Sequence, residues 1–387
     1  MIETLFISVG AVLVIATLPL VLELLLVTSA HLLPSRERTD FPGCDAPVLT
    51  VIVPAHNEEL LIGRSVTSLQ KSSRGKARIL VIAHNCQDAT SEEALSAGAE
   101  VLVYNDPAAS GKGHALRHGL KQAVLDGAGA VLVIDADSTV SENLIPAVEQ
   151  AFCDGAEVLQ CRYEMENVTE RANAALTSLA FRCFTYIRPH GRERLGLSAG
   201  ILGNGFAMTT KVLEEVPYEA FSVVEDLEYH LHLVQSGKRV RFIHDAVVSA
   251  QLPVSHSGQT VQRSRWEGGR LRVARMWLGP LLKQVLRGRL ALAEPLLDLA
   301  GLPMAFAVSA LVVACLLPVD AVRIYGIASL AIVVLHVLAA AWAGPHFFRT
   351  LRVLAMVPLY ILWKFLLIPK LLRSSGAQAA WVRTARQ

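Results

Sequence analysis

The sequence predicts an α/β protein in which a mostly parallel, helix-covered sheet is joined to apolar membrane helices. The chain has 387 residues, of which 52% are hydrophobic and 18% charged, and its mean hydropathy is +0.42. This composition is too apolar for an ordinary soluble protein and too charged for a pure membrane bundle. Long apolar runs stand near both ends of the chain, and short apolar runs alternate with amphipathic stretches between them.

The net charge and the cysteine spacing argue against nucleic-acid-binding, zinc-ribbon and disulfide-rich proteins. The formal net charge is only +2, so no global footprint for nucleic acid is present and no nucleic-acid partner is expected. The six cysteines have no CxxC spacing, which argues against a zinc ribbon and against a disulfide framework. A reduced, cytosolic setting for the soluble part fits this usage.

Residues 1–34 form the first predicted element, an N-terminal transmembrane helix. The run from Thr4 to Leu33 is apolar except for Glu23 and His31, and as a helix it would be about 45 Å long against a hydrocarbon core of roughly 30 Å. We expect Glu23 to face other helices or to lie near an interface. The basic residues Arg36 and Arg38 follow this run, which places the N-terminus outside and the chain beyond it in the cytoplasm.

Residues 48–255 lose the membrane character and are predicted to form an α/β domain. Short apolar runs, each followed by an amphipathic stretch, indicate parallel strands covered by helices. The four pairs are LTVIVP before a helix from about residue 58, RILVIA before one from about 88, AEVLVY before one from 111, and AVLVID before one from 141. In such sheets ligands bind beyond the carboxyl ends of the strands, and here those ends carry polar residues that should meet at one rim.

Residues 256–292 are predicted to form basic amphipathic helices at the membrane interface. The stretch 262–289 contains eight Arg and Lys residues and one Glu, interleaved with apolar side chains. Such a pattern is typical of a helix lying on anionic lipid. The arginines expected to face lipid are Arg263, Arg270, Arg272 and Arg275.

Residues 293–374 are predicted to hold C-terminal transmembrane and interfacial helices, followed by a cytoplasmic tail over 375–387. Two charge-free spans cover 299–317 and 324–343. The stretch 351–372 is also apolar but carries a lysine in its middle, which is costly at the bilayer centre. An interfacial or re-entrant helix is favoured there over a further span, and both readings stay open.

The sequence VLVIDADSTV ends a buried strand with two carboxylates, Asp135 and Asp137. One interpretation is local: Asp137 or Ser138 could cap the helix that starts near residue 141. The other is a divalent-metal and diphosphate site, because hard oxygen ligands suit Mg²⁺ or Mn²⁺. A metal there would neutralise charge on a departing diphosphate.

Other motifs decide between these interpretations. The first strand ends in PAHNEE with Pro54, Asn57 and Glu58, and Asp88 follows the second strand. Further motifs are GKGHALRHGL with Lys112, VVEDLEYHL with Glu225 and Asp226, and QRSRW with Gln262, Arg265 and Trp266. Taken singly, several have plainer explanations. Lys112 could be a surface lysine at a helix start, Asp226 a helix cap and Trp266 an interfacial anchor.

Together these motifs resemble the membrane-bound family-2 glycosyltransferases of the GT-A fold, the group that contains the cellulose, chitin and hyaluronan synthases. The resemblance extends over nearly the whole chain, from the opening span through PAHNEE, DAD, ED and QRSRW to the terminal WVRTAR. It implies a GT-A cytoplasmic domain that binds a nucleotide-sugar. One departure is His84, where the family commonly has an aspartate.

The resemblance also implies a role for each matching residue. Asp226 corresponds to the catalytic general base, and Asp137 and Asp135 to the metal ligands, with Asp137 the better candidate. The remaining assignments are nucleotide-sugar binding by Pro54, Asn57, Glu58, Asp88, Lys112 and Asp135, and acceptor or diphosphate binding by Glu225, Gln262, Arg265 and Trp266. The expected cofactor is Mg²⁺ or Mn²⁺, and the expected donor is a UDP-sugar.

The function expected from these residues is inverting transfer of a sugar to a polysaccharide or lipid-linked glycan at the cytoplasmic face of a membrane. Whether sugars are added singly or processively stays open, and a homo-oligomer or polysaccharide-export partners would fit a processive role. The alternative is a non-catalytic, nucleotide-sugar-binding scaffold of an exopolysaccharide assembly complex. A dinucleotide-binding oxidoreductase is excluded because no GxGxxG follows the first strand.

Overall fold

The computed structural model describes residues 1–34, 45–109, 111–166, 172–251 and 256–374. These residues form two compact units. The helical unit contains the described residues within 1–34, 168–197 and 267–377, and the sheet unit those within 35–167 and 198–266. The sequence analysis includes 168–197 in the domain 48–255, whereas the described residues 172–197 belong to the helical unit.

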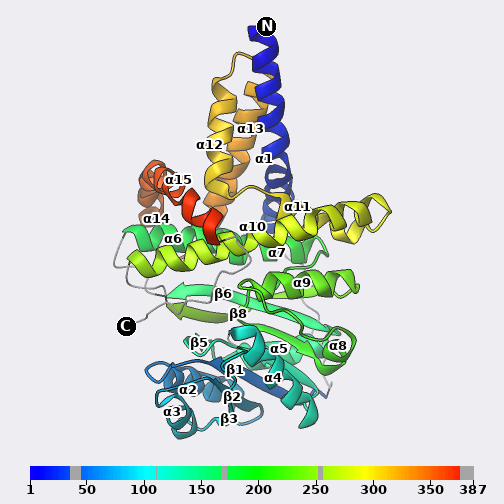
Figure 1. Ribbon diagram of the computed structural model, residues 1–387, viewed down its shortest axis with the longest axis vertical. Helices are drawn as coiled ribbons and strands as arrows, with labels where there is room; N and C mark the ends of the chain where they lie inside the picture. The colour runs from blue at the N-terminus through cyan, green and yellow to red at the C-terminus, as the bar shows by residue number, and fades with distance from the viewer. Residues whose placement is uncertain (35–44, 110, 167–171, 252–255, 375–387) are drawn as a thin grey trace. The chain divides into compact units, whose positions relative to one another are not determined.

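The sheet unit is built on one mixed, mostly parallel sheet with the strand order β3-β2-β1-β4-β7-β6-β8-β5 (Figure 1). Strands β1, β2, β3 and β4 pair in parallel, β6 pairs in parallel with β8, and the antiparallel pairs involve β7 and β5. The strands are β1 (Leu49–Ala55), β2 (Arg78–His84), β3 (Glu100–Tyr104), β4 (Ala130–Val133), β5 (Ser138–Val140), β6 (Val158–Glu166), β7 (Phe206–Thr209) and β8 (Val240–Gln251). The predicted α/β class is confirmed.

Helices cover both faces of this sheet. They are α2 (Ile62–Ser73), α3 (Thr90–Ser96), α4 (Lys112–Leu125), α5 (Leu144–Cys153), α8 (Thr210–Glu215) and α9 (Glu225–Gln235). On one face Val51 packs in a core that includes Val66 of α2 and Val148 of α5, and all three are fully buried. On the other face α4 comes so close that a Cβ added to Gly119 would lie 3.1 Å from the side chain of Ile52. Successive strand residues point to opposite faces, which explains why the whole of β1 is apolar.

The predicted alternation of strands and helices is present in the predicted order, with later helix starts. The helix expected from about residue 58 begins at Ile62, and the one expected from 141 begins at Leu144. The intervening residues form the loops that follow β1 and β4. Neither Asp137 nor Ser138 caps α5, because the residue before this helix is Asn143.

The helical unit contains α1, α6, α7 and the helices after residue 266. The bounds are α1 (Ile2–Leu32), α6 (Ala172–Arg182), the π-helix η1 (Cys183–Ile187), α7 (Arg188–Arg194), α10 (His256–Leu286, which begins in the sheet unit), η2 (Leu290–Leu292), α11 (Ala293–Ala300), α12 (Met304–Leu316), α13 (Asp320–Trp342), α14 (Phe347–Val353), η3 (Leu354–Met356) and α15 (Val357–Ser374). Helices α1, α12 and α13 pack side by side (Figure 1).

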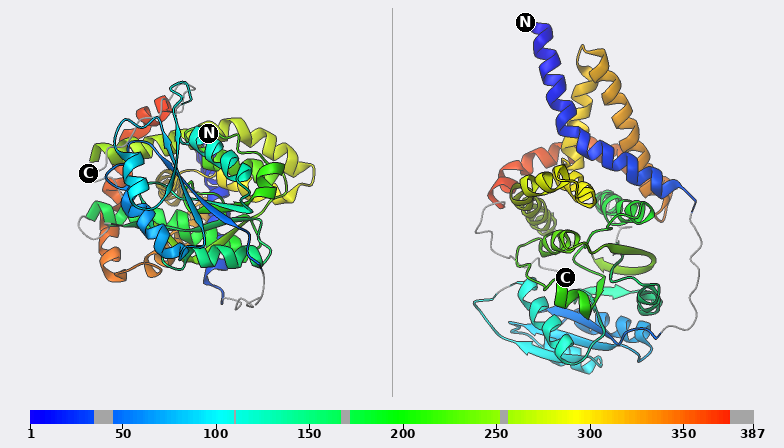
Figure 2. Two further views of the ribbon diagram at one scale, coloured as in Figure 1. Left: turned by 90° about the horizontal axis from the view of Figure 1, so that it is seen from below. Right: turned by 90° about the vertical axis from the view of Figure 1, so that its right-hand side faces the viewer.

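Polar contacts also join α1 to α13. The Thr17 hydroxyl lies 2.8 Å from the Tyr325 hydroxyl, and the Thr28 hydroxyl lies 2.7 Å from Nδ1 of His336. Hydrogen bonds of this kind supplement close packing between membrane helices, where the hydrophobic effect gives little net attraction. Helix α1 contains Pro19 in its interior, a residue that bends helices, and Figure 2 shows α1 bent.

By length and composition, three described helices could cross a membrane: Ile2–Leu32, Asp320–Trp342 and Phe347–Pro369. The predicted span over 299–317 is not one of these three helices. There α12 has only 13 residues, about 20 Å of helix, and follows α11 after a bend of 80°, so the pair forms a broken span or a re-entrant loop. The segment 347–369 is long and apolar enough to cross.

Parts of the predicted topology lie outside the described residues. Arg36 and Arg38, on which the predicted orientation of α1 depends, are among them, as is the predicted tail 375–387. Cys153 is disulfide-bonded; a single bond of this kind is not the disulfide framework against which the cysteine spacing argues. The thiols of Cys86, Cys161, Cys183 and Cys315 are free.

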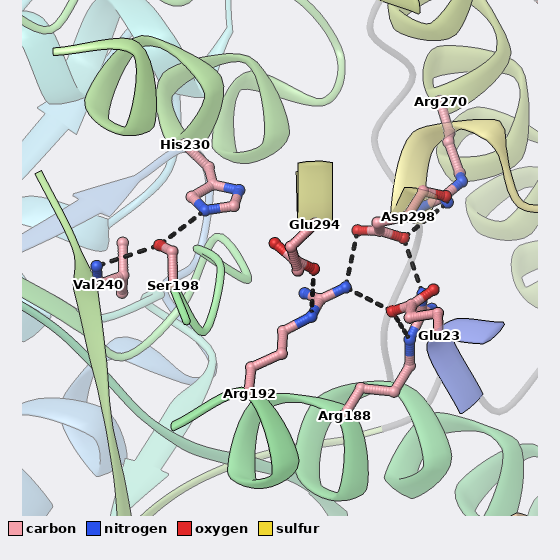
Figure 3. A network of polar contacts seen from close by, with 9 residues as sticks. All are labelled: Glu23, Arg188, Arg192, Ser198, His230, Val240, Arg270, Glu294 and Asp298. Atoms are coloured by element: carbon pink, nitrogen blue, oxygen red, sulfur yellow. Dashed lines mark hydrogen bonds and ion pairs between the residues drawn. The ribbon is translucent and has the colours of Figure 1, made fainter. Parts of the chain in front are cut away.

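A network of buried charges connects four helices of the helical unit (Figure 3). Three carboxylates and three guanidinium groups take part: Glu23, Glu294, Asp298, Arg188, Arg192 and Arg270. Nε of Arg188 lies 2.8 Å from Glu23, and Nη2 of Arg192 lies 2.6 Å from the same carboxylate. The equal numbers of opposite charges compensate the cost of burying each ion. Glu23 therefore faces other helices, as expected.

The network corrects one sequence expectation. Arg270 was expected to face lipid, but its Nη2 lies 2.8 Å from Oδ1 of Asp298. The basic pattern of 262–289 thus serves in part to neutralise a buried acid. Figure 3 also shows a buried contact of the sheet unit, in which the Ser198 hydroxyl lies 3.0 Å from Nε2 of His230 and accepts the backbone N–H of Val240.

Gly191 marks the closest approach of α7 to α1. A Cβ at this position would lie 2.1 Å from the carbonyl oxygen of Val27, so the two helices would have to separate. We expect Gly191→Ala to lower the melting temperature of the detergent-purified protein by several degrees, because overpacking costs about 1–3 kcal/mol. Gly279→Ala in α10 is the matched control, since its Cβ would meet nothing within 4 Å. Equal melting temperatures for the two variants would contradict this interpretation.

Candidate functional site

The carboxyl ends of the parallel strands meet at one edge of the sheet. Ala55 at the end of β1 is paired with Ala83 near the end of β2, and His84 is paired with Tyr104 at the end of β3. Strand β4 runs parallel to β1 and ends at Val133, just before the two aspartates. The predicted rim of polar residues is therefore present, and the ends of α4 and α9 supply further charged groups.

Asp135 and Asp137 follow β4 on either side of a buried alanine. Both are partly exposed, while Ala136 between them is buried. The backbone N–H of Asp135 donates to the side-chain oxygen of Asn204 at 3.0 Å. Oδ1 of Asp137 accepts a hydrogen bond from the Ser138 hydroxyl at 3.2 Å. The turn after β4 is thus held by hydrogen bonds, and both carboxylates remain accessible.

Lys112 is the first residue of α4 and pairs with Asp135. Its Nζ contacts Oδ1 of Asp135 and also donates to the carbonyl oxygen of Gly203. Burial alone would lower the pKa of this amine, but the neighbouring carboxylates of Asp135 and Glu225 outweigh it and raise the pKa. Lys112 is therefore a permanent cation at the rim, and it is part of a charged cluster rather than a solvated surface lysine.

Glu225 and Asp226 begin α9 close to this pair. The pKa of Glu225 is raised to about 7, mainly because the carboxyl is buried; the charge of Lys112 opposes this rise and that of Asp226 adds to it. Burial also raises the pKa of Asp226, although the backbone N–H of Leu227 donates to its Oδ1 at 2.8 Å and opposes the shift. The residue before α9 is Val224, so neither acid is its N-cap.

Gln262, Arg265 and Trp266 lie in the part of α10 that belongs to the sheet unit. Gln262 is buried and the Trp266 side chain is exposed. Nε of Arg265 is buried and has no hydrogen-bond partner among the described residues. Burial lowers the pKa of Arg265, while Glu225, Asp135 and Asp226 lie near enough to raise it. A desolvated guanidinium with a free donor can bind an anion.

The remaining predicted residues form a second group in the loops after β1 and β2. Asn57 has a left-handed backbone with φ of 55°, and its Oδ1 accepts the N–H of Gln87 at 2.7 Å. The N–H of Glu58 donates to the Thr90 hydroxyl at 2.8 Å, and Asp88 also accepts from Thr90. These bonds tie the two loops together beside Pro54, the sixth residue of β1.

His84 ends β2 inside an aromatic stack. Its ring is 5.0 Å from that of Tyr104 at an interplanar angle of 11°, and Tyr104 stacks in turn on His118 at 4.2 Å. Burial lowers the pKa of His84, so its imidazole is neutral at physiological pH. At this position the chain thus has an uncharged ring. Oδ1 of the neighbouring Asn85 accepts the backbone N–H of Asp106 at 2.7 Å.

The structure brings together residues from four separate stretches of sequence: Asp135, Lys112, Glu225, Asp226 and Arg265. Sequence reasoning missed two others. Asn204 is only 1% exposed and binds the backbone of Asp135, and Tyr163 of β6 lies near Asp135 and Asp226. The motif GILGNGFAM was the available signal, but its glycines have an equally good explanation as turn residues.

The loop 200–205 needs a glycine at position 203 both for its backbone turn and for its close approach to Asp226. Gly203 has φ of 76°, and a Cβ there would lie 3.1 Å from Oδ2 of Asp226. A side chain would therefore press on the carboxylate as well as strain the backbone. Gly203 leaves Asp226 accessible and places its own carbonyl against Lys112.

The donor set of this site fits a magnesium-like ion only in part. No group of three or more His, Cys, Asp and Glu side chains able to hold a metal is found in the described portion of the chain. Asp135 and Asp137 supply two hard carboxylates. Mg²⁺ is commonly held by one or two carboxylates while substrate phosphates and water complete its shell. The residues present therefore fit a metal that binds together with a diphosphate.

The raised pKa of Glu225 predicts a pH-dependent stability. Its carboxyl ionises near 4.5 in the unfolded chain and near about 7 in the folded one, so the folded protein binds more protons between these values. Stability contributed by the protonated group is therefore lost as pH rises from 4.5 to about 7 and is constant above. We expect the melting temperature of Glu225→Gln, relative to the wild type, to rise across this window.

The size of this effect is up to about 3 kcal/mol, from 1.36 kcal/mol per pKa unit. Differential scanning fluorimetry in detergent between pH 5 and 8 measures it. Glu228→Gln, on the same helix, is the control and is expected to track the wild type. Parallel curves for Glu225→Gln and the wild type would show that Glu225 is not buried as described.

Comparison with a solved structure identifies the fold. A solved mannosyltransferase, PcManGT from Pyrobaculum calidifontis in complex with GDP-Man and Mn²⁺, superposes with a TM-score of 0.56, at 17% identity, over 98% of this chain and 99% of that one. Both chains therefore share a GT-A-like fold. The identity is too low to carry over anything but the fold.

Two curated relatives match over 250 residues. A probable glycosyltransferase of Bacillus subtilis, YdaM, is 24% identical over 62% of this chain and 59% of its own length. A probable glycosyltransferase of Sulfolobus acidocaldarius is 25% identical over 61% of this chain and 53% of its own length. The matched region thus spans a little over half of each relative.

The family model described as glycosyltransferase-like family 2 matches residues 46–269, which include every predicted site residue. Because this match covers more than half of the chain, the chain belongs to the glycosyltransferase-like family 2.

Proposed function

We propose that the protein is a metal-dependent, inverting glycosyltransferase that takes a sugar from a nucleotide-sugar. The observation that carries this proposal is the convergence of Asp135, Glu225 and Asp226 with the cations Lys112 and Arg265 at the rim of a GT-A-like sheet. Capping or surface roles would scatter these residues. Their concentration creates a site with separate acidic and basic groups.

Asp226 is the proposed general base. It would take the proton from an acceptor hydroxyl as that oxygen attacks the anomeric carbon of the donor, and one displacement inverts the configuration. Its pKa is raised by burial, which makes the carboxylate a stronger base than a solvated aspartate. The positive charges of Lys112 and Arg265 favour the ionised form of Asp226, which a base requires.

Arg265 and Lys112 are proposed to bind the departing diphosphate. Arg265 presents a buried guanidinium nitrogen without a partner among the described residues, and Lys112 begins α4. Fixed cations aimed at developing negative charge stabilise a transition state more effectively than water does. Asp135 and Asp137 would hold the Mg²⁺ or Mn²⁺ ion, which when bound neutralises phosphate charge.

The proposed acceptor is a polysaccharide or a lipid-linked glycan at the cytoplasmic face of a membrane. Three helices long and apolar enough to cross a bilayer support the membrane location. The grouping with the cellulose, chitin and hyaluronan synthases remains part of this proposal, and it rests on the motifs DAD, ED and QRSRW.

The donor is proposed to be a UDP-sugar, with GDP-sugars as the main alternative. His84 is uncharged and buried where an acidic side chain would favour one base, so the base is best found by experiment. The test is a donor screen with the purified chain in detergent. A panel of UDP- and GDP-sugars is offered with Mg²⁺ or Mn²⁺, and the released nucleoside diphosphate is measured.

The expected result is metal-dependent release of one nucleoside diphosphate, enhanced by membrane lipid extract or oligosaccharide as acceptor. Chelation with EDTA should abolish it. Binding of a nucleotide-sugar without any release or transfer, across all donors and acceptors tried, would instead support the scaffold alternative.

A further inference from the structure

The loop after β6 and α7 contains a buried amide that touches the turn carrying both aspartates. Asn204 is 1% exposed, and Ser138 beside it is fully buried. Asn204 lies two residues before β7, which pairs with β4 in the sheet. The sheet therefore holds Asn204 next to the end of β4.

Both side-chain hydrogen bonds of Asn204 reach the turn after β4. Its Oδ1 accepts the backbone N–H of Asp135 at 3.0 Å, and its Nδ2 donates to the Ser138 hydroxyl at 2.8 Å. That hydroxyl in turn donates to Oδ1 of Asp137 at 3.2 Å. One side chain therefore contacts the backbone of the first aspartate directly and the carboxylate of the second through one hydroxyl.

The backbone around Asn204 is itself held by hydrogen bonds to β6 and β4. Gln160 is fully buried in β6, and its Nε2 donates to the carbonyl oxygen of Asn204 at 2.7 Å, while its Oε1 accepts the N–H of Leu202 at 2.9 Å. The N–H of Gly205 donates to Val133 at the end of β4 at 2.9 Å. Because the backbone at Asn204 is held in this way, its side-chain amide can keep the turn after β4 in one conformation.

We infer that Asn204 is a positioning residue that orients Asp135 and Asp137 as a pair of oxygen ligands for a divalent cation. The inference rests on the proposed function. Asn204 does not contact the cation; it holds the turn after β4 so that both carboxylates keep one relative position. Groups that orient ligands in this way commonly change metal affinity by about 10- to 100-fold when removed.

The test uses Mn²⁺ binding to the full-length protein in detergent, measured by electron paramagnetic resonance. Mn²⁺ is titrated with saturating UDP and, separately, with saturating GDP, because the proposed ion shares its shell with a diphosphate. We expect Asn204→Ala to weaken Mn²⁺ binding by about 10- to 100-fold. Ser138→Ala, which keeps the bond to Asp135, should weaken it less.

Asn143→Ala is the matched control. The Nδ2 of Asn143 likewise donates a hydrogen bond, to the carbonyl oxygen of Asp245 at 3.0 Å, and Asn143 belongs to the turn before α5. The Asn143→Ala substitution should leave the Mn²⁺ affinity unchanged. A residue that only stabilised the fold would lower the melting temperature of Asn204→Ala without changing the affinity of the folded fraction.

Folded Asn204→Ala with wild-type Mn²⁺ affinity would overturn the inference. If this variant does not fold, Ser138→Ala decides alone, and wild-type affinity in that variant has the same meaning. A wild-type protein that binds no Mn²⁺ with either nucleotide, and transfers no sugar, would overturn the proposed function instead.

Discussion

Replacing Asp226 with asparagine is expected to lower the rate of sugar transfer by about 10³-fold while the protein remains folded. A positioned general base contributes about 10²- to 10⁴-fold, and the amide cannot accept the proton. The substitution is nearly isosteric and keeps an oxygen that can accept the N–H of Leu227, so little structural change should accompany the loss.

The measurement is the turnover number with the donor found in the screen, alongside the melting temperature. Asp154→Asn is the matched control, because it removes the same charge at the end of α5, where the Asp154 carboxylate accepts a hydrogen bond from Gln150. Asp226→Asn with more than a tenth of the wild-type turnover would move the role of base to another group. Glu225 would then be tested in the same way.

Replacing Arg265 with alanine is expected to lower turnover by about 10²- to 10³-fold, the usual effect of removing one preorganised group from a developing negative charge. Arg265 is desolvated, lies near the three acids of the site, and has a buried Nε without a partner among the described side chains and backbone. Its charge is therefore available to the diphosphate in the transition state.

Arg265→Lys should recover part of the loss but not all of it. Lysine keeps the charge, but it lacks the planar pair of donors that matches a phosphate. Arg287→Ala, an exposed arginine in the turn after α10, is the control and should retain wild-type turnover. A loss confined to donor KM, with turnover unchanged, would show that Arg265 binds the ground state and transition state equally.

Much of the architecture follows from local sequence patterns. Short apolar runs bounded by turn residues predict β1 to β4, and each observed strand overlaps its run. The long runs around α1 and α13 are apolar over the length needed to cross a bilayer. Helix starts were less accurate, since α2 begins four residues later than expected, because the polar residues after β1 form a loop instead of a first turn.

The predicted span over 299–317 shows how such a pattern fails. Its residues are apolar, but Gly301 and Pro303 divide it, and the observed helix begins at Met304 after a sharp bend. Apolar composition by itself does not distinguish a continuous helix from two short ones, because hydropathy is insensitive to the backbone break.

The fold class, the long apolar helices and the polar strand ends can be predicted from the sequence, since each depends on residues close together in the chain. The pairing of Lys112 with Asp135, the contact of Asn204 with the turn after β4 and the charge network around Glu23 become visible only in the folded protein. Glu225 lies far from Lys112 and Asp135 in sequence, and its pKa is raised because folding buries its carboxyl. Burial and contact between distant residues are products of packing, for which the linear sequence carries no periodic signal.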